Sequence, residues 1–458
     1  MRYVSTRDNS KEYSSEDVFI KGLADDGGLY VPTCLKKFSS DELSELKNLN
    51  YNDLSAEIIN QFSSDFISKD DLSSLINKSY STFREKDVVK ISNVGDLKLL
   101  ELFHGPTLAF KDIAMQFIGN LYEYYLSKNN KKINIVVATS GDTGAAAIDA
   151  IKGKSNLNIF VLHPNNRISP VQRKLMTTVE DENVFNIAID GNFDDCQNIV
   201  KQMFSDLDFS KSINMSGVNS INWARIIFQI VYYFYSFLRM NYKKVNYSVP
   251  TGNFGDIYAG YMAKKMGLPI EKLIVATNEN DILQRVINKG IYKPTKVKSS
   301  LSPSMDIQVS SNFERLLFYI LKEDDQKVKS LMKSLKEKGS FILEKEEISE
   351  IKKHFQSEKI NDDETLSIIK EIYENEKFII DPHTATAFGA INKIGEPKDV
   401  VVLGTAHPYK FLETVKKATG KNLKAPHQLE KFIENDEKFD IIENNNEKIK
   451  EYILNKIK

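Results

Sequence analysis

The sequence has few of the residues that form disulfide frameworks or bind metal ions. Only two cysteines, Cys34 and Cys196, occur among its 458 residues, and they lie far apart in the chain. Their number excludes a disulfide framework and a cysteine-based zinc site, and it fits a reducing compartment. The six histidines are scattered, with no His-x-x-x-His pair, so we expect no metal site.

The chain also lacks an excess of charge of either sign. It has 62 basic residues against 63 acidic ones, a net charge of −1. Binding to a nucleic-acid backbone needs a basic surplus, so the composition excludes nucleic acid as a partner. No apolar run approaches the roughly eighteen residues that a membrane span needs. Residues 1–8 contain no apolar signal region, and we therefore predict a cytoplasmic protein.

The length and the order of the predicted elements divide the chain into three parts. A chain of 458 residues is long enough for two or three domains. Residues 1–95 are predicted to form a mainly helical N-terminal domain, and residues 96–427 a catalytic core in two subdomains. A Lys- and Glu-rich stretch at about 315–377 is predicted to be a helical insertion on the outside of that core. For residues 428–458 we expect a C-terminal helical tail.

The core has the sequence pattern of an α/β protein. Short apolar runs predict strands at residues 133–138, 157–162, 184–189, 245–249, 273–276 and 400–403. Helical segments follow several of them, and repeated strand–loop–helix units favour parallel sheets with right-handed crossovers. Ligands bind beyond the carboxyl ends of such strands, so the loops at those ends are where we expect a functional site.

One lysine, Lys111, lies between a turn and the predicted start of a helix. Gly105 and Pro106 make the turn. Apolar residues then recur every four positions, at Ile113, Phe117, Leu121 and Tyr125. Beside Phe110 the amine is partly desolvated, and it lies near the positive end of the helix dipole, so both effects favour the neutral form. A neutral amine can attack a carbonyl group and form an imine, although a solvated surface lysine is the commoner explanation for a single lysine.

The loop at residues 138–144 connects a predicted strand to a helix. The backbone N–H groups at the helix start and the hydroxyls of Ser140 and Thr143 make a small anion site that suits a carboxylate. An ordinary connection in which these residues cap the helix explains the same pattern.

A second loop, at residues 250–256, also connects a strand to a helix. Gly252 and Gly255 allow the backbone to approach a ligand closely, which suits one phosphate monoester. The spacing matches neither the nucleotide P-loop nor the dinucleotide fingerprint. Alone, such a loop is a weak signal.

A third loop, at residues 404–408, places Thr405 at a strand end, where its hydroxyl can point at a ligand. His407 precedes a proline and is more often a packed residue than a catalyst. Together the three loops and Lys111 offer an imine-forming lysine, a one-phosphate cradle and a carboxylate pocket. A phosphorylated aldehyde that acts on amino acids needs that set, and pyridoxal 5'-phosphate is such a cofactor.

These segments resemble the threonine synthase family, in its longer class with an extra N-terminal domain. The resemblance covers nearly the whole chain and lies in residues 2–7, 27–32, 104–112, 139–144, 219–225, 250–256 and 404–408. It implies a fold type II, tryptophan-synthase-β-like lyase that depends on pyridoxal phosphate. The implied reaction converts O-phospho-L-homoserine and water to L-threonine and phosphate by γ-elimination and β-addition of water.

The resemblance also implies roles for particular residues. Lys111 would carry the cofactor imine, and Thr405 would face the pyridine nitrogen. The cofactor phosphate would be held by Gly252, Asn253, Phe254, Gly255 and Asp256. The substrate carboxylate would be met by Ser140, Gly141, Asp142 and Thr143. Shorter members of the family have Asn in place of Asp142, and a carboxylate there would repel the substrate carboxylate.

The substrate phosphate needs a second anion site. We expect Asn219 and Arg225 to contact the substrate, since arginine suits bidentate phosphate binding. A structural ion pair in the core explains Arg225 equally well.

Other functions fit the same residues. A phospho-lyase that releases 2-oxobutyrate and a serine or threonine deaminase would use the same scaffold. A protein that binds an amino-acid phosphate without turnover would use the same anion sites but form no imine. We expect a monomer or a homodimer.

Overall fold

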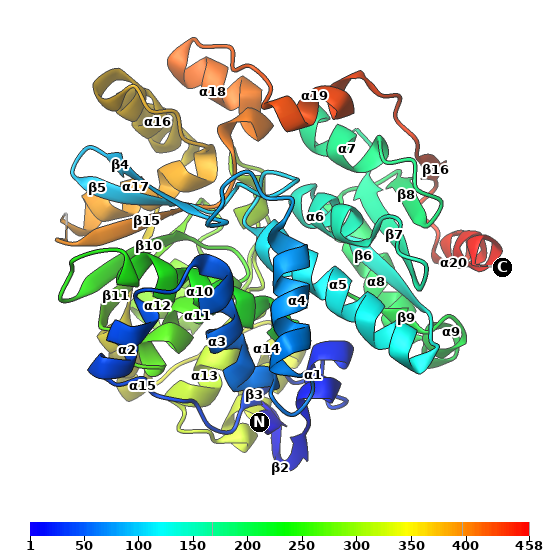
Figure 1. The fold of residues 1–458 in the computed structure, drawn as a ribbon, viewed down its shortest axis with the longest axis horizontal. Helices are drawn as coiled ribbons and strands as arrows, with labels where there is room; N and C mark the ends of the chain where they lie inside the picture. The colour runs from blue at the N-terminus through cyan, green and yellow to red at the C-terminus, as the bar shows by residue number, and fades with distance from the viewer. Residues whose placement is uncertain (167, 396, 458) are drawn as a thin grey trace.

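Two sheets of mainly parallel strands form the frame of the molecule, with helices packed on both faces of each (Figure 1). The structure is a computed structural model that describes residues 1–166, 168–395 and 397–457. The larger sheet has the strand order β14 (Phe355–Lys359), β11 (Ile270–Thr277), β10 (Val245–Pro250), β15 (Val400–Gly404), β5 (Leu97–Glu101) and β4 (Lys90–Val94). Its neighbouring strands are parallel, except that β4 and β5 form an antiparallel hairpin.

The smaller sheet lies beside the larger one and is parallel throughout. Its strand order is β16 (Asp440–Ile442), β8 (Val184–Ile189), β7 (Leu157–Pro164), β6 (Ile133–Ala138) and β9 (Met215–Ser216). The predicted α/β fold with parallel sheets flanked by helices is therefore confirmed. The inner strands β6, β7, β10 and β15 are buried along most of their length, because helices cover both of their faces.

Helices join the strands and cover the sheets. The helix α5 (Lys111–Asn129) begins at Lys111, as predicted, and packs against α6 (Asp142–Ile151). Gly119 allows this contact, because a Cβ there would lie 2.3 Å from a carbonyl oxygen of α6. The helix α10 (Trp223–Leu238) is buried along almost its whole length and contacts α5. These helices bring the amino ends of α5 and α6 to one place, between the sheets.

The other helices of the part of the chain that forms the two sheets lie around those sheets (Figure 1). They are α7 (Pro170–Thr177), α8 (Phe193–Ser205), α9 (Leu207–Ser212), α11 (Gly255–Lys265), α12 (Ile282–Lys289), α17 (Pro382–Ile394) and α18 (Leu412–Thr419), with the short 3-10 helices η1 (Pro303–Met305) and η2 (Pro408–Phe411). No helix within the described residues has the length and apolar character that a membrane span requires.

The N-terminal part combines four helices with a small antiparallel sheet. The helices are α1 (Ser15–Lys21), α2 (Ser40–Leu46), α3 (Tyr51–Ser63) and α4 (Lys69–Tyr80), and the sheet has the order β2 (Asp8–Tyr13), β1 (Tyr3–Ser5) and β3 (Tyr30–Pro32). The boundary predicted at residue 95 lies in the turn of the β4–β5 hairpin. The strand β4 therefore belongs to the larger sheet, which its polar sequence did not indicate.

The segment predicted as a helical insertion at about 315–377 is not purely helical. Its helices are α13 (Phe313–Ile320), α14 (Asp325–Lys338), α15 (Lys345–His354) and α16 (Asp362–Glu376). Between the last two lies β14, an edge strand of the larger sheet, and a short hairpin joins β12 (Ile291–Tyr292) to β13 (Phe341–Ile342). The segment thus completes the sheet rather than only covering it.

The C-terminal tail likewise contributes to a sheet. It contains two helices, α19 (His427–Glu434) and α20 (Asn446–Lys456), and between them β16 pairs with β8. Ile449 and Ile453 of α20 are buried against the smaller sheet. A strand of three residues carries too little sequence pattern to be predicted, so the expected helical tail is corrected to a helix–strand–helix unit.

Candidate active site

Lys111 lies where the two sheets meet. Beside it, the N–H of Phe110 donates to the carbonyl of Thr405, just after β15 of the larger sheet, at 2.9 Å. A β-bridge between Ala109 and Ala406 extends this contact. On the other side the Lys111 Nζ lies 3.4 Å from Oδ2 of Asp142, which follows β6 of the smaller sheet. The lysine is therefore fixed between the carboxyl ends of two strands, the place predicted for the site.

Both carboxylate oxygens of Asp142 have partners. Oδ1 lies 2.5 Å from Lys410 Nζ and accepts from Gln172 Nε2 at 2.9 Å. Oδ2 accepts from Ser304 Oγ at 3.0 Å and from Lys111. Burial alone raises the pKa of Asp142, but Lys410 and Lys111 outweigh it and hold the pKa well below its usual range. Asp142 is thus an ionised carboxylate held by four side chains.

The environment of Lys111 favours the neutral amine. Burial is the main cause that lowers its pKa. Asp142 acts in the opposite direction, while the positive charges of Lys410 and Arg225 lower the pKa further. A lysine with a lowered pKa is a nucleophile towards an aldehyde, so the geometry and charge around Lys111 suit imine formation.

The loop before α11 offers backbone N–H groups to an anion. Phe254 is the N-cap of α11, in the left-handed conformation with φ 61°, and no side chain caps the helix. The first N–H groups of a helix have no partner within it, so they can donate to a phosphate. Gly252 is tightly enclosed, because a Cβ there would lie 2.8 Å from the carbonyl oxygen of Ser304. Ser304 therefore contacts both this loop and Asp142.

Two residues of this loop that were predicted to bind phosphate, Asn253 and Asp256, use other groups for contacts within the protein. The carboxylate of Asp256 accepts hydrogen bonds from Tyr232 at 2.5 Å and Tyr233 at 3.0 Å, so it faces α10. Burial raises its pKa to about 7, although the two tyrosines lower it in part. The carbonyl of Asn253 accepts from the backbone and side chain of Asn312. For these two residues the backbone N–H is the group suited to a phosphate.

The loop before α6 is partly occupied by its own contacts. Thr139 Oγ1 accepts from the N–H groups of Gly141 and Gly144, each at 2.9 Å. Ser140 and Thr143 are partly exposed. With the charge of Asp142 neutralised by lysine, the repulsion of a substrate carboxylate expected from the sequence is much reduced.

Arg225 is buried, and among the residues that the structure describes it has no carboxylate partner. Its Nη1 reaches the carbonyl of Val218 only at 3.5 Å, and its Nε has no hydrogen-bond partner among the described residues. In the described part of the chain no carboxylate oxygen lies within 4.0 Å of its guanidinium, which argues against the structural ion pair. Burial lowers its pKa to about 10, with Tyr232 opposing. The other predicted substrate ligand, Asn219, is exposed at the start of the turn that leads into α10.

Known protein families and individual proteins resemble the chain over nearly its whole length. The family model for the N terminus of threonine synthase matches residues 2–80, that for pyridoxal-phosphate-dependent enzymes matches residues 97–406, and that for the C-terminal part of threonine synthase matches residues 384–453. A threonine synthase of Pseudomonas aeruginosa is 44% identical, over 99% of this chain and 98% of that protein. The chain belongs to the threonine synthase family. The threonine synthase of Saccharomyces cerevisiae is 47% identical over 91% of this chain and 88% of its own.

Solved structures of threonine synthases have the same fold. The pyridoxal-phosphate-bound enzyme of Brucella melitensis superposes with a TM-score of 0.96 at 43% identity, covering 100% of this chain and 99% of that one. The yeast enzyme superposes with a TM-score of 0.94, also at 43% identity, covering 100% and 98%. The predicted fold type II architecture is confirmed, and the cofactor of this family is pyridoxal phosphate.

The residues of the site fit this cofactor. Lys111 supplies a buried amine with a lowered pKa, and the uncapped start of α11 supplies backbone donors for one phosphate group. Ser304 joins the two features, because it contacts both Gly252 and Asp142.

Several residues of the site were not predicted from the sequence. Lys410, Gln172 and Ser304 surround Asp142. Behind Ser304, the ring of His383 accepts the Ser304 N–H at Nε2, at 3.2 Å, and its Nδ1 lies 2.8 Å from Asp381. For Lys410 the sequence offered one signal, because this lysine lies among apolar residues directly after the loop of Thr405 and His407. Nothing in the sequence connected it to Asp142.

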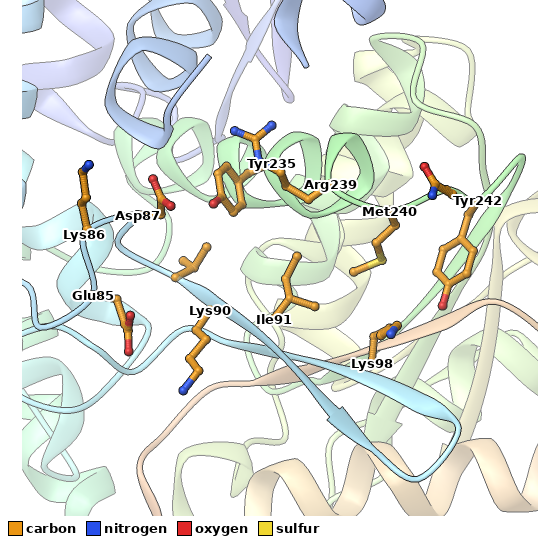
Figure 2. Close-up of a pocket in the computed structure, with 12 residues that line it drawn as sticks. Glu85, Lys86, Asp87, Lys90, Ile91, Lys98, Tyr235, Arg239, Met240 and Tyr242 are labelled. Carbon is orange, nitrogen blue, oxygen red and sulfur yellow. The ribbon is translucent and has the colours of Figure 1, made fainter. Parts of the chain in front are cut away.

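A separate surface pocket of about 680 Å³ lies between the β4–β5 hairpin and the carboxyl end of α10 (Figure 2). Lys90, Ile91 and Lys98 line it from the hairpin, and Tyr235 and Arg239 line it from the helix. None of the predicted site residues is among its lining residues, so it is distinct from the active site.

Proposed function

We propose that this chain converts O-phospho-L-homoserine and water to L-threonine and phosphate. The proposal is supported by relatives that are named threonine synthase and that are similar to this chain over most of their length. The observation that carries it is the presence of two separate places for an anion near one buried lysine. The start of α11 suits the cofactor phosphate, and the unpaired guanidinium of Arg225 suits a second one. A deaminase of serine or threonine needs only the first.

The residues of the site would divide the work as follows. Lys111 would hold the aldehyde carbon of the cofactor, and the N–H groups of residues 252–256 would hold its phosphate. When bound, pyridoxal phosphate supplies an electron sink that stabilises a carbanion at the substrate Cα. Thr405 would face the pyridine nitrogen with a neutral hydroxyl, positioned by its backbone contact to Phe110.

The substrate would be held by the loop before α6 and by the start of α10 with the turn that precedes it. Ser140, Gly141 and Thr143 would bind its carboxylate through hydroxyls and N–H groups. Arg225, with Asn219 nearby, would bind its phosphate. As a neutral amine, Lys111 would accept the proton from Cα, because burial and neighbouring positive charges disfavour its ammonium form. Burial of the site excludes bulk water from these proton transfers.

Product analysis tests this proposal. The purified protein is loaded with pyridoxal phosphate and incubated with O-phospho-L-homoserine, and phosphate, threonine and 2-oxobutyrate are quantified. We expect threonine and phosphate in equal amounts. Phosphate with 2-oxobutyrate would instead identify a phospho-lyase, and binding without either product would identify a non-catalytic protein.

The role of Lys111 has its own test. Borohydride reduction of the loaded protein should attach the cofactor to the peptide that contains Lys111, and label on another lysine would contradict the assignment. The Lys111→Ala variant should lose turnover by about two to four powers of ten or more, because the base and the anchor are both removed.

The cellular setting completes the proposal. Cys34 and Cys196 are both free thiols, one exposed and one buried, which supports a reducing compartment such as the cytoplasm. The chain would act as a monomer or a homodimer, and light scattering of the loaded protein distinguishes the two.

A further inference from the structure

A second lysine of the active site has no part in the reaction proposed above. The side chain of Lys410 is 0% exposed, and its Nζ lies 2.5 Å from Oδ1 of Asp142. It also donates to the carbonyl of Thr107 at 3.0 Å, in the turn that precedes Lys111. A buried lysine is rare unless it is paired, and this one is paired with the carboxylate that Lys111 also contacts.

The two lysines contact Asp142 unequally. Lys410 lies 2.5 Å from Oδ1, whereas Lys111 lies 3.4 Å from Oδ2. We infer that Lys410 is a positioning residue, which stays paired with Asp142 while Lys111 leaves this carboxylate to bind the cofactor and to transfer protons. The inference rests on the proposed role of Lys111. It adds that Lys410 is the permanent counter-ion of Asp142.

The physical reason is the high free energy of an unpaired buried charge. If Lys111 were the only cation beside Asp142, each departure of Lys111 would leave an uncompensated carboxylate, which is strongly unfavourable in a buried site. Lys410 removes that obstacle, because Asp142 remains neutralised whether or not Lys111 is near. Lys111 can then change its charge and its bonding partner without a large electrostatic penalty.

The surroundings hold this pair in place. Gln172 and Ser304 donate to the two oxygens of Asp142, at 2.9 and 3.0 Å. Ser304 is in turn fixed through its N–H by His383, which lies against Asp381. Asp142 therefore cannot turn to follow Lys111.

The pair also sets the charge that Lys111 experiences. The charged groups that act on Lys111 are Asp142 from α6, Lys410 from η2 and Arg225 from α10, and His383 from α17 acts on Asp142. Of the first three, only Asp142 favours a proton on Lys111. Loss of the Lys410 charge leaves Asp142 free to act on Lys111 alone, so the pKa of Lys111 should rise.

Titration of the visible absorbance of the loaded enzyme, without substrate, measures this effect. The band of the cofactor bound to Lys111 reports the proton on the Lys111 nitrogen. In Lys410→Met we expect the midpoint to rise by about 1 pH unit or more, the shift typical of a nearby opposite charge. The control Lys417→Met removes a positive charge from the exposed face of α18 and should leave the midpoint unchanged.

A double variant separates the charge effect from a merely structural one. Lys410→Met combined with Asp142→Asn has no unpaired buried carboxylate, so its midpoint should return towards that of the parent enzyme. A midpoint that stays raised in the double variant, or one that does not move in Lys410→Met, would overturn the inference. If Lys410→Met fails to fold or to load cofactor, recovery of loading in the double variant supports the inference, and failure to recover contradicts it.

A second readout does not need the cofactor. In the cofactor-free full chain, acetic anhydride is reacted with the protein across a range of pH, and acetylation of the Lys111 peptide is quantified by mass spectrometry. The midpoint should be higher in Lys410→Met than in the parent. Borohydride labelling is run beside it, because label away from Lys111 would reject the proposed role of Lys111, whereas correct label with unshifted midpoints would reject only the role of Lys410.

Discussion

Arg225 is the residue that most sharply separates the proposed reaction from its alternatives. It lies in the first turn of α10 and is 3% exposed, and within the described part of the chain its Nε has no hydrogen-bond partner. A buried guanidinium without an anion is costly. With the substrate carboxylate bound at the start of α6, a substrate phosphate would supply that anion.

Replacement of Arg225 by methionine should weaken substrate binding but not cofactor binding. A charge-assisted contact is worth roughly 1.5–3 kcal/mol, which corresponds to about one to two powers of ten in kcat/KM. Steady-state kinetics with O-phospho-L-homoserine should show a higher KM, and the Kd for pyridoxal phosphate should be unchanged. Arg239→Met, at the exposed end of the same helix, is the control. Normal kinetics in Arg225→Met would remove this residue from the site.

Asp256 is a buried carboxyl whose ionisation opposes folding. Its pKa rises from 3.8 to about 7 in the folded protein, mainly through burial. Because the folded state binds this proton more tightly than the unfolded state, stability falls as the pH rises from about 4 to 7. At about 1.4 kcal/mol per unit of pKa shift, the loss has an upper limit of about 4 kcal/mol.

Asp256→Asn should therefore stabilise the protein selectively at high pH. The amide oxygen can still accept from Tyr232, but it does not ionise. Thermal unfolding of the variant and the parent is compared at pH 5 and pH 8, and the advantage of the variant should be larger at pH 8. An equal difference at both values would show that this carboxyl does not titrate in the range.

At the scale of elements, the loop that leads into α11 determines how closely the backbone can approach a phosphate. A Cβ at Gly252 would lie 2.8 Å from the backbone oxygen of Ser304, too close for any real contact. A Cβ at Gly255 would meet the Asn312 side chain at 3.3 Å, a tight but tolerable contact. The two glycines therefore differ in what a substitution would displace.

Gly252→Ala should weaken cofactor binding more than Gly255→Ala does. Overpacking costs about 1–3 kcal/mol, which corresponds to a Kd for pyridoxal phosphate about fivefold to 150-fold higher. Titration of the cofactor-free protein with pyridoxal phosphate measures both Kd values. If Gly255→Ala had the larger effect, the close approach would lie at the start of the helix and not at the contact with Ser304.

At the scale of the whole molecule, one arginine joins the N-terminal part to the active site. Arg315 of α13 is fully buried and donates to the carbonyls of Tyr30 at 2.9 Å and Ile221 at 2.6 Å. It also donates to Asn312, which holds the carbonyl of Asn253 in the phosphate loop. The N-terminal sheet, the turn before α10 and the phosphate loop therefore meet at this side chain.

Arg315→Met should destabilise the whole protein and increase the mobility of the turn before α10 and of the phosphate loop. Each buried carbonyl that loses its donor costs about 1–3 kcal/mol, so we expect a loss of about 2–6 kcal/mol and a higher Kd for pyridoxal phosphate. The guanidinium lies 5.3 Å from the ring of Trp223, the single tryptophan of the chain, so fluorescence follows the same region during unfolding. Lys329→Met on the exposed face of α14 is the control, and an unchanged Tm in Arg315→Met would show that the N-terminal part is held by other contacts.

The sequence by itself determined the elements and the loops of the site. Short apolar runs predict the strands, and the spacing of apolar residues places the start of α5 at Lys111, because both patterns are local in the chain. The motifs around Lys111, residues 250–256 and Thr405, in that order along the chain, indicated the family. Short strands such as β4 and β16 were not predicted, because a segment of a few residues has too little sequence pattern to indicate which strand it pairs with.

Only the tertiary structure decided which side chains meet. Asp142 looked unfavourable beside a substrate carboxylate until Lys410 was found to neutralise it. From the sequence, an ion pair in the core is as plausible for Arg225 as an anion site, but in the structure no carboxylate of the described residues pairs with its guanidinium. Such pairings join residues far apart in the chain, and burial and charge depend on the packing of many elements at once, so no local pattern could specify them.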